Sequence, residues 1–133
     1  MTQPSEAVAT RSILVVDDDD EIRSVLPRCL AALGFEVAAA ADGGEALSLL
    51  EGRGYDAVIC DLTMPKMNGA DLFCQCRERW PEVARRFIFL SGSSGDLPVV
   101  KAATVTGQPF LQKPCRLAEI RAAIEQLLLD VAS

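Results

Sequence analysis

The stretch YDAVICDLTMPKMNG, residues 55–69, decides the fold. Residues 57–60 form an apolar run without a polar break, which is typical of a strand buried on both faces in a parallel sheet covered by helices. The run ends on Asp61, and a turn rich in proline and glycine follows. In open parallel sheets, ligands bind outside the carboxyl ends of the strands. We therefore expect Asp61 at a ligand-binding edge.

Other apolar runs end on polar side chains in the same way. SILVV (12–16) precedes Asp17, Asp18, Asp19 and Asp20, FIFL (87–90) precedes Ser91, and a brief run at 108–111 leads to Lys113 and Pro114. A fifth strand, FEVAAA, is predicted at 35–40. Apolar residues at helical spacing predict a helix after each strand. The helix over 96–106 is the weakest of these, because it is rich in β-branched residues.

Strands that alternate with helices predict an α/β fold with a doubly wound, five-stranded parallel sheet and five helices. We expect the flavodoxin-like strand order 2-1-3-4-5. This order makes strands one and three neighbours, about 4.8 Å apart, and places strand five about 10 Å from strand three. Asp17, Asp18 and Asp61 would then lie together, with Lys113 within reach of Asp61.

The length and composition exclude several classes of protein. A chain of 133 residues corresponds to about one domain. Its first residues, 1–11, are polar, and we interpret them as a flexible tail. A net charge of −6 argues against direct binding of nucleic acid. No apolar run reaches the roughly 20 residues of a membrane span, and no secretory signal is evident. The five cysteines are an odd number scattered over predicted strands and helices, which indicates reduced thiols in a cytoplasmic protein. Because there is no histidine and no second cysteine pair, the Cys74–Cys76 pair is interpreted as packing rather than as a metal site.

The polar residues at this edge of the sheet suggest phosphoryl chemistry. Clustered carboxylates stay ionised together when a cation is present, and oxygen ligands favour Mg²⁺, with Mn²⁺ as an alternative ion. Asp61 would be the nucleophile that forms an acyl phosphate, while Lys113 offsets charge on the phosphoryl oxygens and Ser91 donates a hydroxyl. Asp19 and Asp20 are interpreted as solvated or helix-capping residues.

Four motifs, ILVVDDD, DLTMPKMNG, FLSG and FLQKP, occur in an order and at intervals that resemble the CheY-like response regulator receiver domains of two-component signalling. The resemblance extends from Ile13 to Leu129, and we expect a single receiver domain over residues 12–131. It implies that a sensor histidine kinase or a histidine phosphotransfer protein phosphorylates Asp61 from a phosphohistidine. It also implies a domain that is not an enzyme, because it assists only its own phosphorylation and dephosphorylation.

The resemblance also implies roles for further residues. Mg²⁺ would be held by Asp17, Asp18, Asp61 and the backbone carbonyl of Thr63. The switch residues would be Ser91 and Phe110. Lys113 would contact the phosphate, and the Lys113–Pro114 peptide would be cis. Phosphorylation would switch the face made by the fourth helix, the fifth strand and the fifth helix, which an unidentified protein target would read.

Two residues depart from the family pattern. Phe110 stands where many members have tyrosine, and Gly92 where many have a small side chain. The glycine leaves the phosphate site more open, so we predict that Asp61 phosphate is accessible to attack by water or a phosphotransfer histidine and is not long-lived.

Two other functions compete with this interpretation. A haloacid-dehalogenase-like phosphatase also uses an aspartate nucleophile, but it needs a second acid at the position of Thr63. A pseudo-receiver that is never phosphorylated would be a pure interaction module. The sequence ends four residues after Leu129, so we expect either a single-domain regulator or a receiver excised from a larger protein such as a hybrid kinase.

Overall fold

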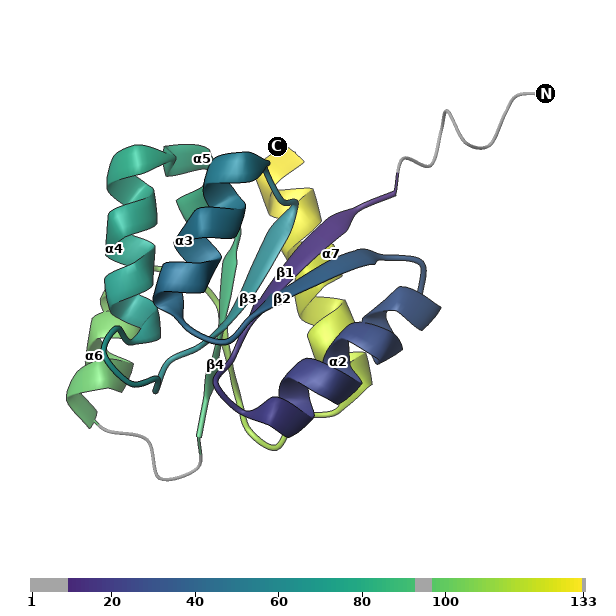
Figure 1. Cartoon of the computed structure of the whole chain (residues 1–133), viewed down its shortest axis with the longest axis horizontal. Coiled ribbons are helices and arrows are strands. Elements are labelled where there is room, and N and C mark those ends of the chain that lie inside the picture. Colours follow the sequence, from purple (N-terminus) through teal and green to yellow (C-terminus); the bar gives the residue numbers. More distant parts are fainter. Residues whose placement is uncertain (1–9, 93–96, 133) are drawn as a thin grey trace.

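The structure is a computed structural model that describes residues 10–92 and 97–132. The strands are β1 (Ser12–Val16), β2 (Glu36–Ala40), β3 (Ala57–Asp61), β4 (Phe87–Ser91) and β5 (Phe110–Gln112). The helices are α2 (Asp20–Ala32), α3 (Gly43–Gly52), α4 (Gly69–Arg79), α5 (Pro81–Ala84), α6 (Leu97–Val105) and α7 (Leu117–Ala132). The strands form one parallel sheet in the order β2-β1-β3-β4-β5, which confirms the predicted topology (Figure 1).

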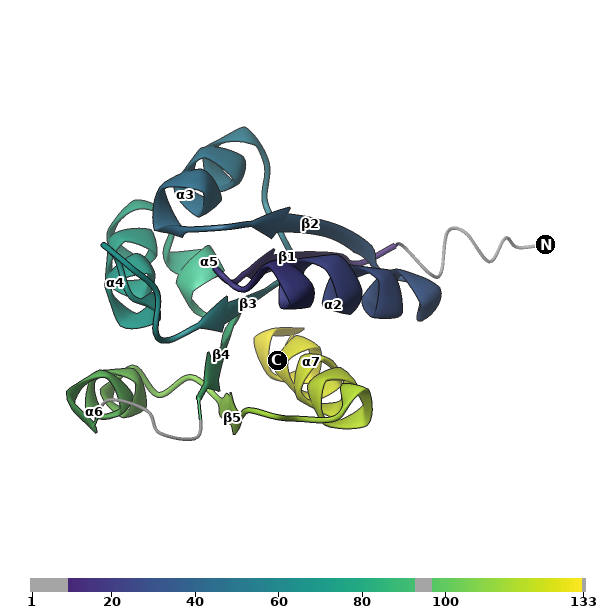
Figure 2. The ribbon, with the colours of Figure 1, turned by 60° about the horizontal axis from the view of Figure 1, so that its bottom comes forward.

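Helices cover both faces of the sheet (Figure 2). On one face, α2 and α7 pack against Ile13, Ile59 and Ile88, whose side chains alternate with those that point the other way. On the opposite face, α3, α4, α5 and α6 cover a cluster that includes Phe87 and Phe89. Every residue of β1, β3 and β4 is buried, as the uninterrupted apolar runs predict.

The elements differ from the sequence-based expectation in the number of helices and in several boundaries. In the described residues there are six helices rather than five, because Pro81 begins the short α5 as well as following the end of α4. Proline suits the first helical position, where its missing N–H is not needed. Strand β2 begins at Glu36, one residue later than predicted, and β5 covers Phe110–Gln112 rather than 108–111.

The late start of β5 has a local cause at Pro109, which has no N–H to donate to the Phe87 carbonyl of β4. The side-chain amide of Gln108 donates to this carbonyl instead, at 3.1 Å, and to the carbonyl of Arg85 at 3.0 Å. Two other expectations fall partly outside the described residues: the tail, at residues 1–9, and the start of the fourth predicted helix, at Asp96. No helix in the described parts of the chain is long and apolar enough to cross a membrane.

Candidate functional site

The register of the sheet brings the predicted site residues to one edge. Strands β1 and β3 are paired with Val16 opposite Cys60, so Asp17 and Asp61 follow side by side. Asp61 is paired with Leu90 on β4, and Ser91 with Gln112 on β5, directly before Lys113. Asp17, Asp61 and Ser91 are all buried, with exposed fractions of 0, 5 and 4 %. The sequence-based placement of these residues is therefore correct.

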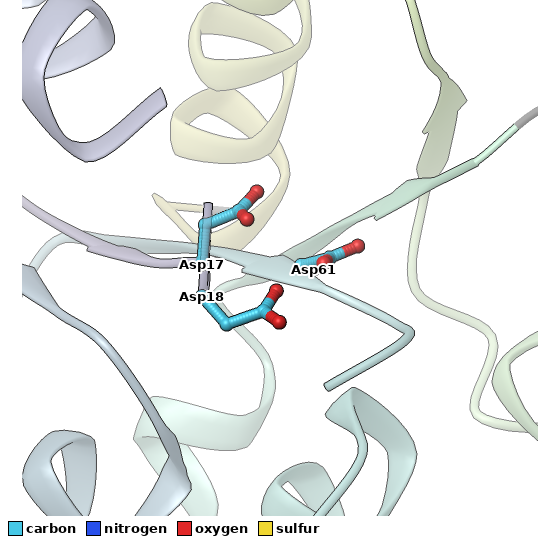
Figure 3. Close-up of side chains that lie close together, drawn as sticks. All are labelled: Asp17, Asp18 and Asp61. Carbon is cyan, nitrogen blue, oxygen red and sulfur yellow. The ribbon is translucent and has the colours of Figure 1, made fainter. Parts of the chain in front are cut away.

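Three carboxylates form a cluster at this edge. Asp17 and Asp18 at the end of β1 and Asp61 at the end of β3 each offer an oxygen, and these oxygens lie within 4.8 Å of one another (Figure 3). Asp18 is exposed, whereas the other two are buried. An all-oxygen donor set with one side open to solvent fits Mg²⁺, which takes a few carboxylates and keeps several waters.

Lys113 crosses from the end of β5 to the carboxylates. Its Nζ lies 2.9 Å from Asp17 Oδ2 and 3.4 Å from Asp61 Oδ1. The predicted contact with Asp61 is present, and the closer contact with Asp17 was not predicted. The Lys113–Pro114 peptide bond is cis, in agreement with the resemblance.

The surroundings of Asp61 and Lys113 shift the pKa of both groups. Burial, followed by the negative charge of Asp17, raises the pKa of Asp61 to about 6, although Lys113 and the Thr63 N–H act in the opposite direction. For Lys113, burial alone would lower the pKa, but the hydrogen bond and charge of Asp17 and the charge of Asp61 outweigh it and raise the pKa. Lys113 is thus a cation at neutral pH. A further cation beside Asp61 would stabilise the ionised form of the Asp61 carboxylate.

The turn after Asp61 is held by the first residues of α4. A Cβ at Gly69 would lie 2.6 Å from the backbone oxygen of Asp61, so only glycine lets the helix approach the strand this closely. Asn68 and Asp71 form a capping box, in which Asn68 Oδ1 accepts from Asp71 N at 2.8 Å and Asp71 Oδ2 accepts from Asn68 N at 3.3 Å. This turn therefore fixes the end of β3.

Two further acids of the Asp17–Asp20 run support α2. Asp19 is the N-cap of α2 and accepts from the N–H groups of Glu21 and Ile22, and Asp20 forms an ion pair with Arg23. Because Asp19 caps the helix and the Asp20 side chain is exposed, their interpretation as solvated or helix-capping residues agrees with the structure. Sequence analysis missed Arg23, whose Nη1 donates to the backbone carbonyl of Asp17 at 3.0 Å.

Ser91 ends β4, Phe110 begins β5, and Thr63 follows the end of β3 by two residues. The Ser91 hydroxyl donates to the Gly92 carbonyl at 3.3 Å, and Phe110 is 43 % exposed. Thr63 is exposed, and its N–H donates to Asp61 Oδ1 at 3.4 Å.

An open doubly wound sheet with aspartates and a lysine at its switch point defines a CheY-like α/β domain. The response regulator receiver domain family matches residues 13–125, and the chain belongs to this family.

Its curated relatives are longer signalling proteins. The chain is 33% identical over 119 residues to the sensor kinase CckA of Brucella abortus (strain 2308), covering 88% of this chain and 12% of that protein. It is 34% identical over 116 residues to the Regulator of RpoS of Escherichia coli (strain K12), covering 87% of this chain and 33% of that protein. The chain thus spans one third or less of the length of these two relatives.

Solved structures of receiver domains have the same fold over most of their length. A CheY-like receiver domain protein from Methanospirillum hungatei JF-1 is 25% identical with a TM-score of 0.85, covering 93% of this chain and 98% of that chain. A receiver domain protein from Clostridium thermocellum is 29% identical with a TM-score of 0.80, covering 90 and 95% of the two chains.

Proposed function

We propose that this domain accepts a phosphoryl group on Asp61 in a two-component phosphorelay. The donor is a phosphohistidine on a sensor histidine kinase or a histidine phosphotransfer protein. The observation that carries the proposal is the position of the Lys113 ammonium, which lies within 3.4 Å of Asp61 at an edge where three carboxylate oxygens converge. A cation and an acidic cluster around one buried aspartate suit the transfer of a negatively charged group.

The transfer needs a carboxylate nucleophile. An oxygen of Asp61 attacks phosphorus, the phosphorus–nitrogen bond to the donor imidazole breaks, and the electron pair leaves with that nitrogen. The product is an acyl phosphate on Asp61 and a free histidine. Lys113 would hold one oxygen of the transferred group through its ammonium, and Ser91 would turn its hydroxyl from the Gly92 carbonyl toward another.

A divalent cation completes the charge balance. Mg²⁺, or Mn²⁺ in its place, would be held by Asp17, Asp18, Asp61 and the carbonyl of Thr63, and would offset the charge of the phosphoryl oxygens. The fit of the three carboxylates to an oxygen-binding ion supports this part of the proposal.

Phosphorylation would be read at the face made by α6, β5 and α7. Ser91 is buried at the end of β4, while Phe110 on the neighbouring strand is 43 % exposed. Movement of the Ser91 hydroxyl toward the phosphate would free space that the Phe110 ring can enter. A downstream protein, rather than nucleic acid, would bind the repacked face in the cytoplasm.

Beryllofluoride, which mimics a phosphoryl group on aspartate, tests the site without a kinase. We expect bound fluoride resonances in ¹⁹F NMR that require Mg²⁺ and that the Asp61→Asn variant lacks. Absence of these resonances in the folded wild-type domain would favour a pseudo-receiver that binds partners without phosphorylation.

A further inference from the structure

Arg23 connects the end of β1 with the first turn of α2. Its Nη1 donates to the backbone carbonyl of Asp17 at 3.0 Å, and its Nη2 forms an ion pair with Asp20. Only 24 % of the Arg23 side chain is exposed, whereas 92 % of the Asp20 side chain is. The contact with Asp17 is therefore on the protein side of the guanidinium, and the contact with Asp20 is on the solvent side.

Each polar group of Asp17 has a protein partner. Its N–H donates to the carbonyl of Ala40 at 3.1 Å, Oδ1 accepts from Asp19 N at 2.9 Å, and Oδ2 accepts from Lys113 at 2.9 Å. The backbone carbonyl is the remaining group, and Arg23 supplies its donor. This carbonyl belongs to the peptide plane that joins Asp17 to Asp18.

We propose that Arg23 is a positioning residue for the cation site. By holding the peptide plane between Asp17 and Asp18, it fixes the directions of the two adjacent carboxylates that are to share one ion. Partners that orient metal ligands in this way commonly affect affinity 10- to 100-fold. The inference rests on the proposed function, because it concerns the ion that this function requires.

The sign of the effect separates positioning from simple charge. Arg23 is a cation close to the acidic cluster, so its charge alone opposes the binding of a divalent ion. If charge were its only influence, removal of the guanidinium would tighten ion binding. If Arg23 positions the carboxylates, its removal weakens binding despite the lost repulsion.

The test is the affinity for Mn²⁺, measured by electron paramagnetic resonance of the free ion. We expect Arg23→Met to weaken binding roughly tenfold relative to wild type. Arg28→Met removes the same charge from an exposed position of the same helix, and Asp20→Asn removes the solvent-side partner of Arg23. Both controls should bind Mn²⁺ nearly as wild type does.

Equal or tighter Mn²⁺ binding by Arg23→Met would overturn the inference while leaving the proposed function intact. Failure of the wild-type domain to bind Mn²⁺ would instead contradict the proposed function. Unfolding in EDTA shows whether each variant is folded. If Arg23→Met is not, Arg23→Lys decides: it keeps the charge without the two-pronged donor, so weaker binding supports positioning and unchanged binding contradicts it.

Discussion

At the scale of single residues, burial and the neighbouring charge of Asp17 make the ionised form of Asp61 unfavourable when no divalent cation is bound. The folded domain holds a proton on Asp61 more tightly than the unfolded chain does, because the pKa rises from 3.8 to about 6. The stabilising contribution of this group is complete below the unfolded value and is lost as the pH rises through the folded value.

We therefore predict that Asp61→Asn makes the domain more stable than wild type at pH 7.5 in EDTA. The expected gain is about 2 kcal/mol, because the amide cannot ionise. Urea unfolding of both proteins between pH 4 and pH 8 measures it. The gain should shrink as the pH falls below about 6, where wild-type Asp61 is itself protonated. A variant less stable than wild type at pH 7.5 would contradict this view of Asp61.

At the scale of elements, the junction of β3 and α4 controls the backbone around Asp61. We predict that Gly69→Ala destabilises the domain by about 1–3 kcal/mol, because its Cβ would lie 2.6 Å from a backbone oxygen that cannot move alone. Urea unfolding measures the change.

Gly52→Ala is the matched control for this substitution. Gly52 ends α3, and a Cβ there would meet nothing within 4 Å. The control should be neutral or stabilising by up to about 1 kcal/mol. Equal losses for the two substitutions would show that close packing on Asp61 is not the reason for a glycine at position 69.

The elements that the sequence predicts best are the buried strands, because their apolar composition indicates burial on both faces of a sheet. Apart from one polar residue at an end of each strand, β1, β3 and β4 contain only apolar residues, which suit burial on both faces, so their positions follow directly. The short helix α5 is missed because Pro81 signals both the end of one helix and the start of another. The start of β5 is missed because Pro109 has no N–H to pair with the Phe87 carbonyl, which accepts from the Gln108 side chain instead.

At the scale of the whole molecule, the parallel sheet explains why the site is predictable. Strand ends share one edge, so Asp17, Asp61 and Lys113 must meet once the strand order is assumed. The finer geometry is not predictable in this way. That Lys113 lies closer to Asp17 than to Asp61 depends on side-chain packing, and the Arg23 contact uses a backbone carbonyl that sequence does not distinguish.

The proposed read-out face lies on the same sheet as the site, because β5 carries Phe110 and leads directly to Lys113. We predict that beryllofluoride with Mg²⁺ slows amide hydrogen exchange in β5 and the adjoining end of α6, because the Phe110 ring becomes less exposed than its present 43 %. Exchange measured by mass spectrometry tests this, with Asp61→Asn as a control that should not respond. Protection confined to the carboxylate cluster would contradict coupling between the site and this face.

The central claim is that Asp61 accepts a phosphoryl group, and intact-mass spectrometry tests it most directly. The wild-type domain and Asp61→Asn are each incubated with phosphoramidate, a donor with a phosphorus–nitrogen bond, in Mg²⁺ or in EDTA. We predict that only the wild type in Mg²⁺ gains the mass of one phosphoryl group, and that the gain decays on removal of the donor because Gly92 leaves the site open. An equal gain by Asp61→Asn, or no gain by folded wild type in Mg²⁺, would contradict the account.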